Sequence, residues 1–156
     1  MKTRRWLSGA AFVCAALCTA TLALPAFAQG GQPRDIGPAD PLRKVLLDVL
    51  RPTVETDLGQ PVQFVVRILR VQGDWAFADV APRTKDGREI DYRKTHHAQR
   101  IREGAFDGGY VQALLRNEVG RWTVKDFAVG PTDVYYAGWP DTFGAPYRLF
   151  GLKKPD

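Results

Sequence analysis

Residues 41–82 read "PLRKVLLDVLRPTVETDLGQPVQFVVRILRVQGDWAFADVAP", and this stretch decides the fold class because its hydrophobic period changes within it. In the first part, apolar residues recur at spacings of three and four, which is typical of one buried stripe on an amphipathic helix. The stripe consists of Leu42, Val45, Leu46, Val49, Leu50 and Val54. From Val62 onward β-branched residues predominate, and "QGD" at 72–74 separates two strands. The stretch therefore predicts a helix followed by an antiparallel hairpin.

The ends of this helix are marked by residues with defined capping roles. Asp40 stands where an N-cap is expected, with Pro41 at the first helical position. Gly59 is expected to end the helix. Pro52 lies inside it and is expected to kink or split it, because proline lacks the N–H that the helix needs.

The first strand of the hairpin changes its apolar face partway along. Val62, Phe64 and Val66 share one parity, whereas Leu69 and Val71 have the other. A β-bulge between the two groups would bring all five side chains to one face of the sheet.

Beyond this stretch the chain predicts further strands joined by a long polar connection. Asp86–Gly87 is typical of a tight turn. Residues 91–109 are polar and weakly patterned, and we expect a connection there with some strand at Ile101. Residues 110–117, "EVG" and residues 121–130 form a second hairpin. We expect an α+β fold with an N-terminal amphipathic helix packed on an antiparallel sheet of about four strands, followed by short C-terminal helical turns.

The last segment, "GPTDVYYAGWPDTFGAPYRLF" at 130–150, is dense in aromatic residues. They are Tyr135, Tyr136, Trp139, Phe143, Tyr147 and Phe150. We expect a helical turn capped by Thr132 or Asp133, and a second turn from Pro140 to Gly144. Such turns bury rings against a sheet, so closure of the core is the favoured interpretation. The alternative is a sugar- or peptide-binding platform that uses Tyr135 and Trp139.

The first 28 residues have the pattern of a secretory signal peptide. A basic start and an apolar middle precede the triplet Ala26–Phe27–Ala28, which is an A-x-A cleavage site. Arg4 and Arg5 leave the general and twin-arginine export routes both open. We predict a periplasmic or secreted protein with no stable membrane anchor after cleavage; a retained anchor is the less favoured alternative. Residues 29–40 are expected to be a flexible linker and residues 41–156 a single domain.

Removal of this leader changes which chemistries are available. It carries three of the 22 basic residues and none of the 17 acidic ones, which leaves 19 basic against 17 acidic residues. This near balance argues against nucleic-acid binding. The only serine and both cysteines also lie in the leader. Nucleophilic catalysis by serine or cysteine is therefore excluded for the mature chain, and no disulfide can form.

The remaining candidate catalytic and metal-binding residues are few. His96 and His97 are the only histidines, and adjacent residues on a strand point to opposite faces. The favoured interpretation is two loop histidines in a polar segment, so we expect no metal site, and no sequence motif calls for a cofactor. Asp79 and Asp126 lie in apolar strands. The favoured interpretation is that one or both face water or mark a bulge; in an enclosed pocket, burial would instead raise the pKa of the carboxyl group. An isomerase- or dehydratase-like enzyme, or a small-molecule binder, with one of them in an enclosed pocket is the alternative function.

A local excess of positive charge marks residues 83–102. This segment contains seven Lys and Arg residues but only three acidic residues. Arg83, Arg88, Arg93 and Lys94 are the candidate contacts to an anionic envelope component or an envelope protein. A solvated loop of mixed charge is the simpler interpretation.

Three short stretches carry a resemblance to a known group of proteins. They are "GDWAF" at 73–77, "GRW" at 120–122, and the tail that follows within residues 121–146. With them the chain resembles small exported proteobacterial proteins of no established activity, with a cystatin-like or nuclear-transport-factor-like α+β fold. The resemblance implies a fold but no reaction. The favoured function is an exported, non-catalytic protein that binds a ligand or partner at the envelope.

Overall fold

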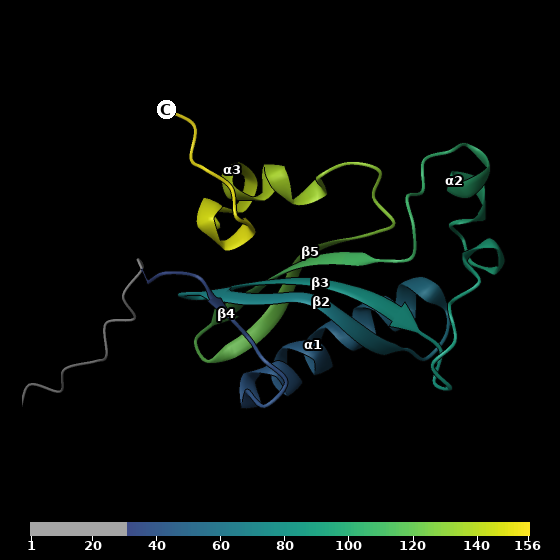
Figure 1. Cartoon of the computed structure of the whole chain (residues 1–156), viewed down its shortest axis with the longest axis horizontal. Helices are drawn as coiled ribbons and strands as arrows, with labels where there is room; N and C mark the ends of the chain where they lie inside the picture. Colours follow the sequence, from purple (N-terminus) through teal and green to yellow (C-terminus); the bar gives the residue numbers. More distant parts are fainter. Residues whose placement is uncertain (1–30) are drawn as a thin grey trace, which may run out of the picture.

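The computed structural model describes residues 31–156, so the predicted leader lies outside the described residues. Five antiparallel strands form one sheet in the order β1-β2-β3-β4-β5 (Figure 1). The elements are β1 (Arg34–Asp35), α1 (Pro41–Leu58), β2 (Gln63–Gln72), β3 (Trp75–Arg83), η1 (Tyr92–Lys94), α2 (Ala98–Arg102), β4 (Val111–Glu118), β5 (Arg121–Val129), η2 (Tyr135–Gly138), α3 (Trp139–Phe143) and η3 (Tyr147–Phe150). The predicted α+β class is confirmed, but the sheet has five strands rather than four.

Helix α1 has the caps that its sequence predicts. The carboxylate of Asp40 accepts the N–H of Leu42 at 2.9 Å, and Gly59 ends the helix with a left-handed φ of 66°. Pro52 does not split the helix, which continues to Leu58. Val54 and Leu58 are buried beyond the proline. Burial of each contributes about 1.5–3 kcal/mol, which offsets the roughly 3 kcal/mol that an internal proline costs.

The extra strand comes from the segment that was expected to be a flexible linker. Arg34 pairs with Val71 and Asp35 with Arg70. Ile36 is buried, and its N–H donates to the carbonyl of Leu69 at 2.8 Å. A two-residue strand is too short to give a period in the sequence, so its contribution to the sheet was missed.

Strand β2 contains the predicted bulge. Its register against β3 shifts between Val66 and Ile68. Phe64 and Val66 before the shift, and Leu69 after it, all pack in the core on the α1 side. The bulge therefore corrects the parity of the strand, as its sequence predicted.

The sheet is covered on its two faces by different parts of the chain. One face packs against α1, where Leu46, Leu50 and Val54 meet the small residues of β3. On the other face, Phe77 of β3 meets side chains of the C-terminal tail. Figure 1 shows α1 on one side of the strands and α3 with the C-terminal turns on the other. No helix within residues 31–156 is long and apolar enough to cross a membrane.

The long connection and the tail differ in detail from expectation. Ile101 lies in α2 rather than in a strand. In the tail, η2 follows Val134 without a side-chain cap, so the predicted caps at Thr132 or Asp133 are wrong. Helix α3 has Pro140 in its first turn and ends at Gly144 with φ of 72°, as predicted.

Candidate functional site

The aromatic tail contributes its central ring to the core. Trp139 is only 2% exposed, and its indole Nε1 donates to a carboxylate oxygen of Asp126 at 2.7 Å. Tyr135, the other tail residue predicted to bind a partner, is 46% exposed and packs edge-on against Trp139. For Trp139, burial supports the core-closing interpretation, whereas Tyr135 keeps a surface that a ligand can reach.

Asp126 has a structural set of partners. One oxygen accepts the Trp139 indole N–H, and the other accepts the backbone N–H of Phe127 at 2.9 Å. These two donors occupy acceptor sites on both oxygens of the carboxylate. We conclude that Asp126 anchors the tail to β5.

Asp79 has a different environment on the same face of the sheet. Its side chain is 8% exposed, and Oδ1 is buried without a hydrogen-bond partner, 3.5 Å from Nη1 of Arg67. Burial raises the pKa of Asp79 above its usual value, and the Arg67 charge opposes this in part. Asp79 therefore does not face water, and the alternative of a buried carboxyl group with a raised pKa applies to it.

This pKa shift predicts how Asp79→Asn changes stability. Because the folded pKa is raised, the charged carboxylate destabilises the fold at neutral pH, and the cost disappears as pH falls through the folded pKa. Asp79→Asn should therefore have a higher melting temperature than wild type at pH 7, with the difference shrinking toward pH 3. Asp48, whose pKa is lowered by its bond to Lys44, gives the control of opposite sign. A melting temperature of Asp79→Asn below wild type at pH 7 would contradict this account.

A pocket of about 280 Å³ lies beside Arg67, between strands β2 and β3 and the connection that follows β3. Arg67 and Arg83 line it together with Glu89, Tyr92 and Tyr110. Arg67 stacks over the Tyr110 ring at 5.0 Å, and Arg83 pairs with Glu89 at 3.0 Å. Burial raises the pKa of Tyr92 to about 12, so its phenol stays neutral. We call this the arginine pocket.

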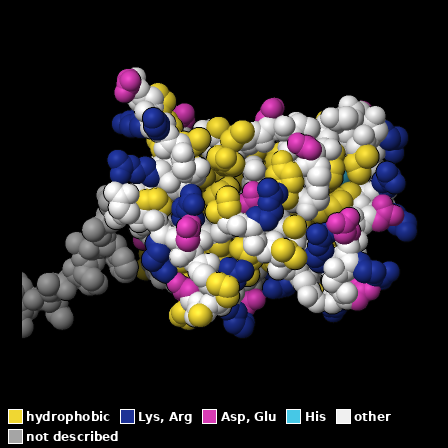
Figure 2. Space-filling view, viewed as in Figure 1, with side chains coloured by type: hydrophobic (Ala, Val, Ile, Leu, Met, Phe, Trp, Pro, Cys, Tyr) yellow, Lys and Arg dark blue, Asp and Glu magenta, His cyan; other side chains and the backbone are white. Residues whose placement is uncertain are grey.

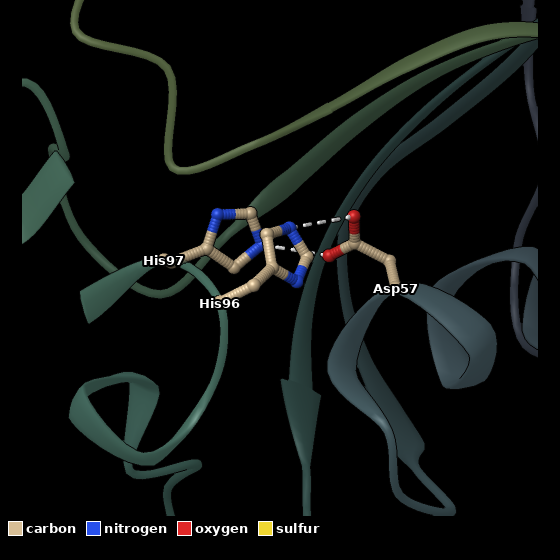
Figure 3. A group of neighbouring side chains, drawn as sticks. All are labelled: Asp57, His96 and His97. Atoms are coloured by element: carbon tan, nitrogen blue, oxygen red, sulfur yellow. Dashed lines mark hydrogen bonds and ion pairs between the residues drawn. The ribbon is translucent and has the colours of Figure 1, made fainter. Parts of the chain in front are cut away.

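A second polar cluster, which the sequence did not predict, lies at the end of α1. Nε2 of His97 lies 2.7 Å from Oδ2 of Asp57, and Nε2 of His96 lies 3.4 Å from Oδ1 of the same carboxylate. The two imidazole rings lie side by side, with centroids 3.9 Å apart, and both point toward Asp57 (Figure 3). The expectation that the histidines face opposite sides is therefore wrong.

The local backbone explains why both rings turn the same way. His96 and His97 lie in a turn before α2 rather than in a strand, so the alternation of strand side chains does not apply. The hydroxyl of Thr95 accepts the N–H of His97 at 3.2 Å and donates to the carbonyl of Tyr92 at 2.8 Å. His97 is 4% exposed and packs against Tyr92 and Phe106.

Arg100 joins this cluster to the start of the tail. Its Nη1 donates to the carbonyl of Val129 at 2.8 Å and its Nη2 to that of Gly130 at 3.1 Å. Nη1 also lies 3.4 Å from Nδ1 of His97. Asp57, His97, Arg100 and Tyr135 all line one open pocket of about 380 Å³. This is the place where the exposed Tyr135 comes near the histidine cluster.

Comparisons of the chain with protein-family models, curated proteins and solved structures find no match. The resemblance to exported proteobacterial proteins therefore stays a prediction. Function has to be argued from the chain's own surfaces and side chains.

Proposed function

We propose that this chain is an exported, non-catalytic protein, periplasmic or secreted, with a cystatin-like fold, and that it binds an anionic component of the bacterial envelope. Export is supported by the basic start, apolar middle and A-x-A triplet of residues 1–28. The cystatin-like assignment is supported by the order of elements, in which one long helix precedes an antiparallel series of four neighbouring strands and packs against them. A fold alone does not give a function, so the binding proposal rests on a surface.

The observation that carries the proposal is the exposed positive charge of residues 83–102, which we call the cationic connection. Arg88 and Lys94 have side chains that are 80% and 84% exposed, and Arg93 is exposed as well. Three acidic residues pair with Arg83, Arg88 and Lys94. Within residues 31–156, Lys85, Arg93 and Arg102 take part in no ion pair, so a net positive charge remains for a partner.

The arginine pocket lies at one edge of this surface. Arg83 belongs both to the pocket and to the cationic connection, and Arg67 adds a further cation from β2. Figure 2 shows Lys and Arg side chains gathered at the end of the molecule where Figure 1 places α2, with acidic side chains among them. Clustered exposed cations beside a polar pocket favour anionic headgroups or acidic chains as ligands.

Binding to anionic vesicles tests the proposal. The purified protein should bind phosphatidylglycerol vesicles better than phosphatidylcholine vesicles, and salt should weaken the binding. Replacing Arg88, Arg93 and Lys94 together with Gln should weaken it by roughly a hundredfold, since each cation near an anionic surface contributes about 1 kcal/mol. The matched control replaces Lys44, Arg121 and Lys153, three exposed cations elsewhere, with Gln. Equal binding by the two triple variants would show that the cationic connection is not the surface that binds the vesicles.

The alternative of an enzyme with Asp79 or Asp126 as a base has one supporting observation, the raised pKa of Asp79. Against it, Arg67 lies beside Asp79 and stacks on Tyr110. Asp126 already accepts two hydrogen bonds that hold the tail. A general base has to lie within reach of the substrate proton, and neither acid lines the arginine pocket beside Arg67. The non-catalytic proposal therefore fits these acids better.

A further inference from the structure

We propose that Asp57, His96 and His97 form a binding site for one divalent transition-metal ion, with Zn²⁺ as the ion that the three ligands suit. One oxygen or nitrogen of each residue lies within 4.8 Å of the others. His96 and His97 lie within the cationic connection, but none of its Lys and Arg residues is a metal ligand, so neither proposal depends on the other.

The ligand types select the class of ion. Two imidazole nitrogens and one carboxylate are typical ligands of Zn²⁺ and related first-row metals, whereas Mg²⁺ and Ca²⁺ prefer oxygen ligands alone. The chain from residue 31 onward contains no cysteine, so a thiolate site is not an option. Two histidines and one acid also form three-ligand zinc sites, which leave a fourth position for water or substrate.

One pair of ligand atoms already has the separation of a tetrahedral site. Ligands about 2.0–2.1 Å from Zn²⁺ lie roughly 3.3 Å from one another in a tetrahedron. The separation between Nε2 of His96 and Oδ1 of Asp57 is 3.4 Å, which matches. Nε2 of His97 lies 2.7 Å from the other oxygen of this carboxylate, Oδ2. Metal binding therefore requires the Asp57 carboxylate to turn so that one oxygen faces both rings, with all three ligand atoms starting within 4.8 Å of one another.

The surroundings hold two of the ligands in place and leave one side open. His97 is fixed by the Thr95 turn and by the rings of Tyr92 and Phe106. Asp57 lies in the last turn of α1, and its side chain is 16% exposed. His96 is 60% exposed, so an ion can enter from solvent on its side. A pre-formed pair of ligands with an accessible third lowers the ordering cost of binding.

The positive charge of Arg100 lowers the affinity of the site for a metal ion. When Nε2 of His97 binds a metal, its proton has to move to Nδ1, which faces the Arg100 guanidinium at 3.4 Å. Arg100 keeps two carbonyl acceptors, Val129 and Gly130, that do not depend on His97. The positive charge of Arg100 therefore weakens metal binding, while Arg100 keeps its hydrogen bonds to Val129 and Gly130.

Calorimetric titration of the chelator-treated protein with ZnCl₂ tests the site. Wild type should bind one Zn²⁺ per chain, and saturation should raise the melting temperature because the ion binds the folded state. His96→Ala and Asp57→Asn should each weaken binding by tenfold or more. His96→Ala removes an exposed side chain, so the variant should fold as wild type does, which circular dichroism can verify.

Asp48→Asn is the matched control, since it neutralises an exposed acid of the same helix and should bind Zn²⁺ as wild type does. The absence of saturable one-to-one binding by wild type would overturn the proposal. So would unchanged affinity in a folded His96→Ala variant, because binding would then not use this pair of histidines.

Discussion

Replacing Trp139 with alanine is expected to lower the free energy of unfolding by about 3–5 kcal/mol, the range for large-to-small changes in a core. The indole is 2% exposed and lies in contact with the rings of Phe77 and Phe150, with centroids 6.2 Å and 5.8 Å away. Its truncation would leave a cavity and also leave Asp126 without its indole donor. A loss of this size is a large share of the ~5–15 kcal/mol that stabilises a domain.

Chemical denaturation of wild type and variant measures this loss. Tyr135→Ala is the matched control, because Tyr135 neighbours Trp139 in the tail but is 46% exposed. Tyr135→Ala should lower the free energy of unfolding much less than Trp139→Ala does. A third variant, Trp139→Phe, keeps most of the ring volume and removes only the N–H, so its cost should fall between the other two. A loss below about 1 kcal/mol for Trp139→Ala would mean that the tail does not close the core.

The same experiment separates the two interpretations of the tail. Exposed aromatic anchors contribute to binding and little to stability, whereas buried rings contribute to stability. Phe77 lies between the sheet and three tail rings, those of Tyr136, Trp139 and Phe150. This ring cluster gives β3 an apolar cover on the face that α1 does not reach.

The parts of the fold that the sequence predicts are those with a repeated period. The stripe of α1 and the alternation of β2 extend over many residues, and the change of parity in β2 was enough to locate its bulge. Strand β1 and helix α2 span only two and five residues, so neither repeats its hydrophobic period. They form because tertiary contacts stabilise them, as when Ile36 is buried beside Leu69.

The candidate sites differ in the same way, because one depends on local sequence and the other on a contact between distant positions. The raised pKa of Asp79 follows from an acid in an apolar strand, which the sequence contains locally. The cluster of Asp57 with His96 and His97 depends on contact between positions about 40 residues apart, and on a turn within a connection whose conformation the sequence does not specify. A hydrogen bond at that separation leaves no periodic signal in one sequence. Two adjacent histidines were the available clue, and the strand assumption gave them the wrong orientation.

Replacing Gly130 with alanine should lower the free energy of unfolding by about 2–5 kcal/mol, the second of the two large effects we expect. Gly130 has φ of 55°, and a Cβ atom there would lie 2.4 Å from Cε2 of Phe106. The left-handed backbone costs an alanine roughly 1–2 kcal/mol, and overpacking adds about 1–3 kcal/mol. Phe106 cannot simply move away, because its ring packs against Tyr92 and His97.

Gly144→Ala separates the two causes, since Gly144 has φ of 72° but nothing within 4 Å of its added Cβ. Its loss of stability should be about 1–2 kcal/mol, from the backbone alone. In a Phe106→Ala background, the additional cost of Gly130→Ala should fall to the same value, because the ring that blocks the Cβ is gone. Denaturation of these variants measures the coupling between the two sites. If Gly130→Ala costs no more than Gly144→Ala in the native background, Phe106 does not pack against Gly130. The connection that carries His97 would then be held to the start of the tail by hydrogen bonds, those from Arg100 to Val129 and Gly130 and that from the N–H of Asp107 to Gly130.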